Sequence, residues 1–203
     1  MISNKIQNIL TDSINKNGKA TLLVCGGSSP LKIFEELSIA NLEWDKITIS
    51  LIDDRVVEES NPDSNIFLLK KHLLKDKAAN ANFISLNDNY ADLLKANDFF
   101  DVAIIGIGPD GHFASLFPSM INSTDFLNYD SDPQVISTGL IGSPRYKRTS
   151  MNLALILKTL NIFIVAPNKE KMIVIDEGYK DKMLPVYYLL NQPVRRIEIL
   201  KTF

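Results

Sequence analysis

Short apolar runs alternate with stretches of helical periodicity along almost the whole chain. The apolar runs predict β-strands at residues 20–25, 47–52, 82–86, 101–106, 135–138, 161–166 and 196–200. Helical spacing predicts helices at 2–16, from Pro30 onward, and at 63–74, 91–96, 150–159 and 168–178, with a helical turn after Pro185. Strands separated by helices imply right-handed crossovers and a mostly parallel sheet covered on both faces. The pattern therefore predicts an α/β fold with α/β/α layers, in a single domain over residues 1–203.

Composition narrows the class of protein. A formal net charge of −2 offers no broad attraction to nucleic acid or to anionic membranes. The single cysteine, Cys25, excludes an internal disulfide, and without a Cys/His cluster we expect no structural metal. No apolar run approaches the ~20 residues of a membrane span, and the first residues show no secretory pattern. We therefore expect a cytoplasmic protein that partners neither nucleic acid nor membrane.

The segment from Gly106 to His112 is the strongest candidate for chemistry. The strand at 101–106 ends in a glycine-rich turn that carries Asp110 and His112, and ligands of open α/β sheets bind at this end of the strands. Histidine is suited to act as a base near neutral pH. The segment also matches the G-x-G-x-x-G pattern of dinucleotide sites, but Pro109, Asp110 and the nearby Pro118 argue against that interpretation. The segment therefore predicts that His112 is a catalytic base at the end of this strand.

A second glycine-rich turn, at residues 26–30, is the better candidate for binding phosphate. Two glycines and two serines precede a predicted helix, whose N-terminus favours anions; the alternative is a tight turn in which Ser29 only caps the helix. Asp53, Asp54 and Arg55 follow another predicted strand, and Asn65 offers an amide for a sugar hydroxyl. A solvated loop is the simpler interpretation of the charged group, and a helix cap at Asp63 or Ser64 is the simpler interpretation of the residues beside Asn65.

Basic residues from two separate loops complete the candidate site. The densest basic stretch ends at Arg148, and Lys171 follows the strand at 161–166. An arginine and a lysine from separate loops are a common way to neutralise a phosphate dianion, although most such residues on a surface are only solvated.

In their order along the chain, these motifs resemble the 6-phosphogluconolactonase family, part of a group that includes glucosamine-6-phosphate isomerase/deaminase. The specific part is the string from Gly106 through Gly-Pro-Asp-Gly-His to Ala-Ser-Leu-Phe-Pro, which ends at Pro118. Supporting matches are Gly26-Gly27-Ser28-Ser29-Pro30, Asp53-Asp54-Arg55, Ser64-Asn65, Ser143-Pro144, Arg148-Thr149 and Lys171. The resemblance implies a modified Rossmann-like domain that hydrolyses 6-phosphoglucono-1,5-lactone, without a metal or other cofactor, as a monomer or small homo-oligomer.

The resemblance also implies a role for each candidate residue. His112 would activate water, Asp110 would orient its imidazole or hold a sugar hydroxyl, and Arg55 would stabilise the oxyanion. Asp53 and Asn65 would lie against the sugar hydroxyls. The remaining substrate contacts would come from the two glycine-rich turns and the basic residues: Gly26, Gly27, Ser28, Ser29, Gly108, Arg148 and Lys171, with the two serines, Arg148 and Lys171 on the phosphate.

The chain departs from the family pattern in several places. Cys25, Ser29, Asp54 and Phe113 replace the serine, threonine, glutamate and threonine that are usual there, and the region 119–142 is short. The isomerase/deaminase alternative would need a carboxylate soon after His112, whereas residues 115–118 read Ser-Leu-Phe-Pro. A DNA-binding sugar-phosphate sensor lacks support because no basic or helix-turn-helix segment precedes residue 20. A phosphosugar-binding module without catalysis stays open.

Overall fold

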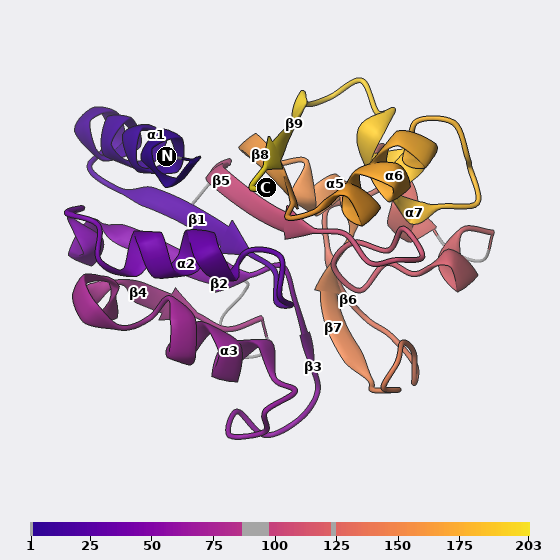
Figure 1. Ribbon diagram of the computed structural model, residues 1–203, viewed down its shortest axis with the longest axis horizontal. Helices are drawn as coiled ribbons and strands as arrows, with labels where there is room; N and C mark the ends of the chain where they lie inside the picture. The colour runs from indigo at the N-terminus through magenta and orange to yellow at the C-terminus, as the bar shows by residue number, and fades with distance from the viewer. Residues whose placement is uncertain (1, 87–97, 123–124) are drawn as a thin grey trace.

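The structure is a computed structural model that describes residues 2–86, 98–122 and 125–203 (Figure 1). Within these ranges the fold is built on a six-stranded sheet in the order β4-β2-β1-β5-β8-β9, and every neighbouring pair is parallel. Its strands are β1 (Ala20–Val24), β2 (Ile47–Leu51), β4 (Asn82–Ile84), β5 (Phe100–Gly106), β8 (Thr159–Ala166) and β9 (Ile197–Lys201). All five positions of β1 are buried, as a central strand covered on both faces requires.

Helices flank this sheet, and the three-layer α/β/α fold predicted from the sequence is confirmed. The α-helices are α1 (Ile2–Asn17), α2 (Leu31–Ser38), α3 (Asn65–His72), α5 (Leu153–Ile156), α6 (Lys169–Gly178) and α7 (Pro185–Leu190). Short 3-10 turns are η1 (Trp44–Lys46), η2 (Asp76–Asn80), η3 (Pro118–Met120) and η4 (Asp125–Leu127). Helix α1 packs on β1 and β5, and α6 packs on β8. The buried apolar side chains of strands and helices form one continuous cluster.

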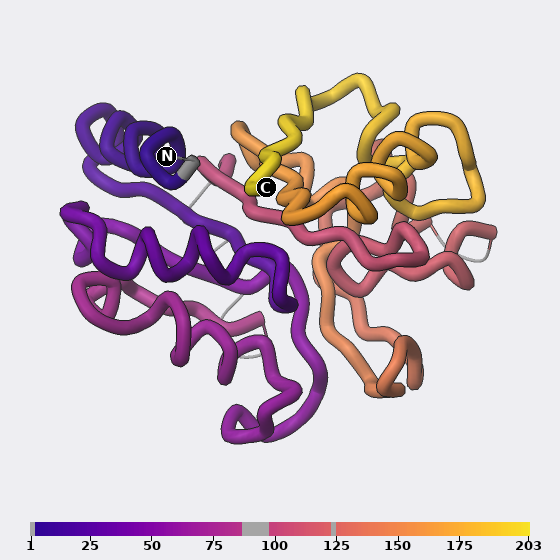
Figure 2. The backbone as a smooth tube through the Cα atoms, viewed as in Figure 1, coloured from indigo at the N-terminus to yellow at the C-terminus, as the bar shows by residue number. Residues whose placement is uncertain are grey.

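The order of the strands reverses between β1 and β5. Figure 2 shows that the first part of the chain, in indigo to magenta, forms one side of the sheet, while the later part, in pink to yellow, forms the other. At such a switch point the loops after the two central strands diverge and leave a crevice at their carboxyl ends, where ligands of α/β proteins bind. The turns that follow β1 and β5 are the two glycine-rich segments singled out in the sequence.

A second, antiparallel sheet lies beyond the carboxyl ends of these strands (Figure 1). It contains β3 (Asp53–Arg55), β7 (Arg148–Met151) and β6 (Val135–Ser137), in that order. In the register of β3 and β7, Arg55 lies opposite Arg148. Two basic residues far apart in sequence therefore reach the same edge of the fold.

Most predicted elements of the described chain are confirmed to within two residues at each end. The helix predicted at 150–159 is wrong: residues 148–151 form β7, α5 covers only Leu153–Ile156, and β8 already begins at Thr159. Ser29 as an N-cap is also wrong, because α2 begins at Leu31 after Pro30, and no side chain caps it. Pro30 is itself the N-cap residue, since the Phe34 amide donates to its carbonyl at 3.0 Å, and Ser29 stays in the turn before the helix. The helix predicted at 91–96 lies outside the described residues.

Candidate active site

A cavity of about 200 Å³ opens at the switch point of the sheet. Every site residue predicted from the sequence lines it except Asp110: Gly26, Gly27, Ser28, Ser29, Asp53, Arg55, Asn65, Gly108, His112, Arg148 and Lys171. Cys25, Gly106, Ile107 and Ala114 also line it, and sequence reasoning did not place them in the site. Their positions beside the predicted residues at the two strand ends could have indicated this. The cavity thus combines side chains from both glycine-rich turns, the small antiparallel sheet and α6.

The turn after β5 holds His112 against Asp110. Gly111 has a φ of +75°, a conformation that glycine adopts without strain, and the Gly108 amide donates to the His112 carbonyl at 2.7 Å. The imidazole lies directly on the Cα of Gly108, since a Cβ there would be 2.1 Å from ring atoms of His112. His112 Nδ1 lies 2.5 Å from Asp110 Oδ1, and this hydrogen bond keeps the pKa of the Asp110 carboxyl below its usual range. Asp110 therefore does not line the cavity itself but holds His112, which does.

The Arg55 side chain lies in the cavity and contacts the residues at the start of α3. Its Nη1 donates to the Asp63 carbonyl and, at 3.2 Å, to Asn65 Oδ1. Its Nε is buried, and within the described chain it has no hydrogen-bond partner. Asn65 in turn donates through Nδ2 to the Asp53 carbonyl at 2.7 Å. The guanidinium is fixed from one side and retains a buried donor for which a ligand could provide the acceptor.

Asp54 is the structural member of the predicted acidic pair. Its carboxylate accepts hydrogen bonds from the amides of Arg55 and Asn65, at 2.7 and 2.6 Å, and from Ser64 Oγ at 3.2 Å. Burial raises its pKa, although the backbone amides act in the opposite direction. Asp54 does not line the cavity; it ties β3 to the beginning of α3, where Ser64 is the N-cap. The helix-cap interpretation was correct for Ser64.

Asp53, by contrast, lines the cavity and connects two elements. Its side chain accepts a hydrogen bond from Ser115 Oγ at 2.6 Å, and Ser115 belongs to the segment that follows His112. Across the cavity, burial lowers the pKa of Arg148, as does the neighbouring Arg55 cation, while Asp53 and Asp54 oppose this. Burial likewise lowers the pKa of Lys171, and Asp110 opposes it. Two partly desolvated cations beside Arg55 favour an anionic ligand.

The turn after β1 is shaped by close backbone contacts. A Cβ at Gly26 would lie 1.8 Å from Asn65 Oδ1, and Gly27 has a φ of +86°. Cys25 accepts a hydrogen bond from the Gly106 amide on its Sγ at 2.9 Å, which joins the ends of β1 and β5. Burial, aided by the nearby Asp53 charge, raises the pKa of the Cys25 thiol to about 12. The thiol is therefore protonated at neutral pH and is no nucleophile.

Neither a metal centre nor a membrane helix is found in the part of the chain that the structure describes. Its residues include no group of three or more His, Cys, Asp or Glu side chains that could hold a metal ion. No helix in residues 2–86, 98–122 or 125–203 is long and apolar enough to cross a membrane.

A parallel α/β sheet with a cation-lined cavity beside a His–Asp pair at its switch point is an arrangement typical of enzymes that act on small anionic molecules. The sequence model of the family described as glucosamine-6-phosphate isomerases/6-phosphogluconolactonase matches residues 1–198, and the chain belongs to this family. The 6-phosphogluconolactonases of Helicobacter pylori and Caulobacter vibrioides are each 31% identical to it over 202 residues, covering 94% of this chain and 87% of theirs. The crystal structure of a 6-phosphogluconolactonase from Shewanella baltica is similar, with a TM-score of 0.86, 28% identity and coverage of 98% of this chain and 91% of that one.

Proposed function

We propose that the chain hydrolyses 6-phosphoglucono-1,5-lactone to 6-phosphogluconate, the lactonase step of the oxidative pentose phosphate pathway. The observation that carries the proposal is the His112–Asp110 pair at the rim of a cavity lined by Arg55, Arg148 and Lys171. It joins a general base to a group of cations that can hold a phosphate, within one cavity. The 6-phosphogluconolactonases among the relatives support the same reaction.

The phosphate end of the substrate is assigned to the turn after β1 and the basic residues. Ser28 and Ser29 offer hydroxyls, while Arg148 and Lys171 offer charge from β7 and α6. These four side chains reach the cavity from three different elements, so they can surround a phosphate dianion. Binding the phosphate fixes the position of the lactone ring relative to His112.

The reaction itself uses His112 as a general base. Asp110 accepts the hydrogen bond of the Nδ1–H, which leaves Nε2 free to take a proton from water. The water oxygen forms a bond to the lactone carbonyl carbon, and the carbonyl π electrons move to oxygen, where Arg55 stabilises the negative charge. When the intermediate collapses, the bond from carbon to the ring oxygen breaks. The ring oxygen takes the proton back from the imidazolium, and the product carries a carboxylic acid that ionises.

The sugar hydroxyls are assigned to Asp53 and Asn65, on the side of the cavity formed by β3 and α3. Asp53 is buried, and both its contact with Ser115 and the amide of Asn65 limit the movement of its carboxylate. A fixed acceptor and a fixed amide can orient a polyhydroxylated ring. Gly26, Gly27 and Gly108 line the cavity beside these groups, and the missing side chains at Gly26 and Gly108 leave room for Asn65 and the His112 ring.

Hydrolysis is favoured over the isomerase/deaminase reaction by the acidic groups in the site. Isomerisation needs further acid and base groups for ring opening and proton transfer. The segment after His112 has no carboxylate before Pro118, and Asp53 is the only acidic side chain among the described residues that line the cavity. Phe113, where the family usually has threonine, is fully buried in the core and does not line the cavity.

A turnover assay with freshly prepared lactone tests the proposal, with spontaneous hydrolysis subtracted and glucosamine 6-phosphate as the alternative substrate. We expect turnover of the lactone in the presence of EDTA. His112→Asn should lower kcat by ~10²–10⁴-fold, the usual contribution of a general base. His72→Asn is the matched control, because His72 is the other histidine and pairs with Glu35 away from the cavity. Full activity in His112→Asn, or turnover of glucosamine 6-phosphate alone, would refute the assignment.

A further inference from the structure

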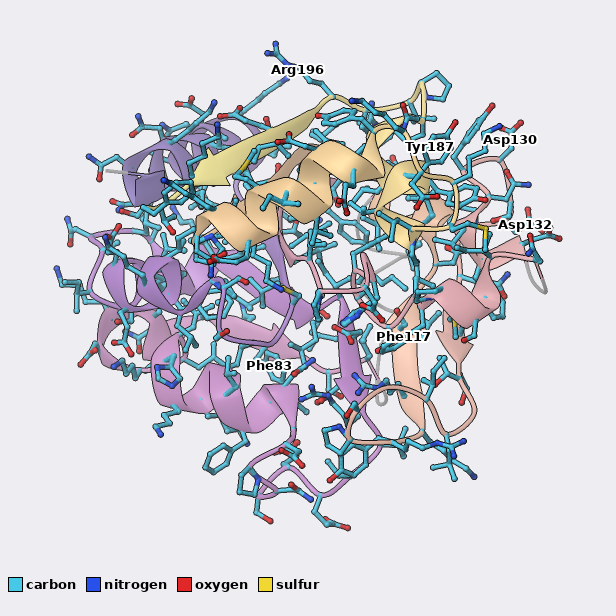
Figure 3. All side chains as sticks on the ribbon, turned by 45° about the vertical axis from the view of Figure 1, so that its right-hand side comes forward. Phe83, Phe117, Asp130, Asp132, Tyr187 and Arg196 are labelled. Carbon is cyan, nitrogen blue, oxygen red and sulfur yellow. The ribbon has the colours of Figure 1, made fainter. Side chains whose placement is uncertain are left out.

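Phe117 contacts two groups of the site at once. Its ring stacks on the imidazole of His112, with centroids 4.4 Å apart and planes inclined by 25°. The guanidinium carbon of Arg148 lies 5.2 Å from the centroid of the same ring. Figure 3 shows Phe117 close to β7, the strand that begins with Arg148. The Phe117 ring therefore contacts both the proposed base, His112, and a proposed phosphate ligand, Arg148.

The surroundings of Phe117 differ from those of an ordinary core residue. The ring is 6% exposed, yet it does not belong to the continuous apolar cluster, which includes its neighbours Phe113 and Leu116. Its ring contacts two groups of the site, the His112 imidazole and the Arg148 guanidinium.

The backbone on both sides fixes the ring in this place. The Met120 amide donates to the Phe117 carbonyl at 2.9 Å, at the start of the 3-10 turn η3. Opposite, Gly142 has a φ of +85°, and a Cβ there would lie 3.1 Å from Phe117 Cζ and 2.6 Å from Arg148 Nη2. The missing side chain at Gly142 leaves the space that the ring and the guanidinium share.

We propose that Phe117 is a positioning residue that sets the relative placement of His112 and Arg148, and through them aligns the reacting carbonyl with the bound phosphate. The proposal rests on the function proposed above. Stacking restricts rotation of the imidazole plane, while the electron-rich ring face attracts the guanidinium. Because both contacts use the same ring, a shift in one group is passed to the other. Loss of the ring should therefore affect the chemical step and substrate binding together.

Phe117→Leu and Phe117→Met remove the ring and keep an apolar side chain, whereas Phe117→Tyr keeps the ring. We expect both non-aromatic variants to lower kcat by ~10-fold and to raise KM by ~5-fold, as the loss of two aromatic contacts predicts. Phe117→Tyr should stay within ~3-fold of the parent protein in both constants. Phe113→Leu is the structural control, because Phe113 is fully buried in the apolar cluster. It should lower the melting temperature without changing kcat or KM.

A second arm measures binding of inorganic phosphate by calorimetry and needs no turnover. Phe117→Leu should weaken phosphate binding by ~5-fold, both in the parent protein and in His112→Asn. In His112→Asn, the added Phe117→Leu substitution should cause no further loss of kcat. The proposal would be overturned by unchanged kcat, KM and phosphate affinity in both non-aromatic variants, or by losses in Phe113→Leu equal to those in Phe117→Leu. If the parent protein lacks lactonase turnover, the proposed function fails, and phosphate affinity still decides whether Phe117 positions Arg148. Loss of activity in Phe117→Tyr equal to that in Phe117→Leu would also contradict the role of the ring.

Discussion

At the scale of single residues, the backbone of Gly108 leaves the space that the His112 ring occupies. Gly108→Ala would place a Cβ 2.1 Å from the ring and 2.8 Å from Asp110 Oδ1, so the imidazole must move. We expect a fall in kcat/KM of ~10²-fold or more, approaching that of His112→Asn, because a displaced base cannot reach the water. Steady-state kinetics, with circular dichroism to confirm folding, measures this.

Gly139→Ala is the control for that experiment, since no atom lies within 4 Å of a Cβ built there. It should retain activity within ~2-fold, as most surface substitutions do. Wild-type activity in Gly108→Ala would show that the imidazole does not work from its observed position.

The His112–Asp110 pair also predicts a pH dependence. The hydrogen bond lowers the pKa of Asp110 in the folded protein relative to the ~3.9 of a free aspartate. Its contribution to stability is therefore present above this ordinary pKa and is lost as the pH falls through the lower folded value. In His112→Ala the Asp110 carboxyl should titrate at a higher pH than in the parent protein. Carboxyl ¹³C NMR measures this, and an unchanged titration would show that His112 is not the cause of the shift.

At the scale of elements, Asp101 joins α1, β1 and β5 at the end of the sheet opposite the cavity. Its carboxylate accepts hydrogen bonds from the Thr21 amide at 2.7 Å, Thr21 Oγ1 at 2.8 Å and Ser13 Oγ at 2.6 Å. Asp101→Ala should lower the free energy of unfolding by about 2–3 kcal/mol, because it leaves buried donors without an acceptor. Urea titration measures this, and kcat/KM of the folded protein should stay unchanged.

Asp98→Ala serves as the matched control, because Asp98 is exposed and precedes the same strand. It should change the free energy of unfolding by no more than about 0.5 kcal/mol. If both variants lost the same stability, the Asp101 network would not be the stabilising feature.

The elements show which part of the fold the sequence could predict. Each central strand is a short apolar run bounded by polar or glycine-rich residues, so the sequence indicates both the type of element and where it ends. The helix predicted at 150–159 is wrong because α5 is a single buried turn that is soon followed by β8. Two apolar elements this close together leave no change of periodicity in the sequence that would separate them. The Asn152 side chain caps α5 by accepting from the Leu155 amide, and this cap was the available indication of where the helix begins.

The candidate site was predictable where residues follow parallel strands and less so elsewhere. The ends of parallel strands meet at one edge of a sheet, so the turns at 26–30 and 106–112 could be placed together from the sequence. Arg148 reaches the cavity through the pairing of β3 with β7, which joins residues about ninety positions apart and leaves no local pattern. The contacts of Phe117 and the space at Gly142 depend on the same long-range packing.

At the scale of the whole molecule, the positions of the proposed phosphate ligands predict that a bound phosphosugar stabilises the fold. The proposed phosphate ligands Arg148 and Lys171 lie on the later part of the chain, whereas Ser28 and Ser29 lie on the first, so a bound phosphosugar would join the two sides of the switch point. The product 6-phosphogluconate at ~100 times its Kd should add ~2.7 kcal/mol of stability. For a domain of this size that corresponds to a rise in Tm of ~5–10 °C.

Differential scanning fluorimetry checks this expectation, with gluconate at the same concentration as the control that lacks the phosphate. Gluconate should raise Tm by less than ~1 °C, because it lacks the phosphate that Arg148 and Lys171 are proposed to bind. His112→Asn should keep most of the shift produced by 6-phosphogluconate, since the base contributes to the reaction and not to phosphate binding. Arg148→Ala should lose most of it. An equal shift with gluconate, or a full shift in Arg148→Ala, would mean that the phosphate binds somewhere other than between the turn after β1, β7 and α6.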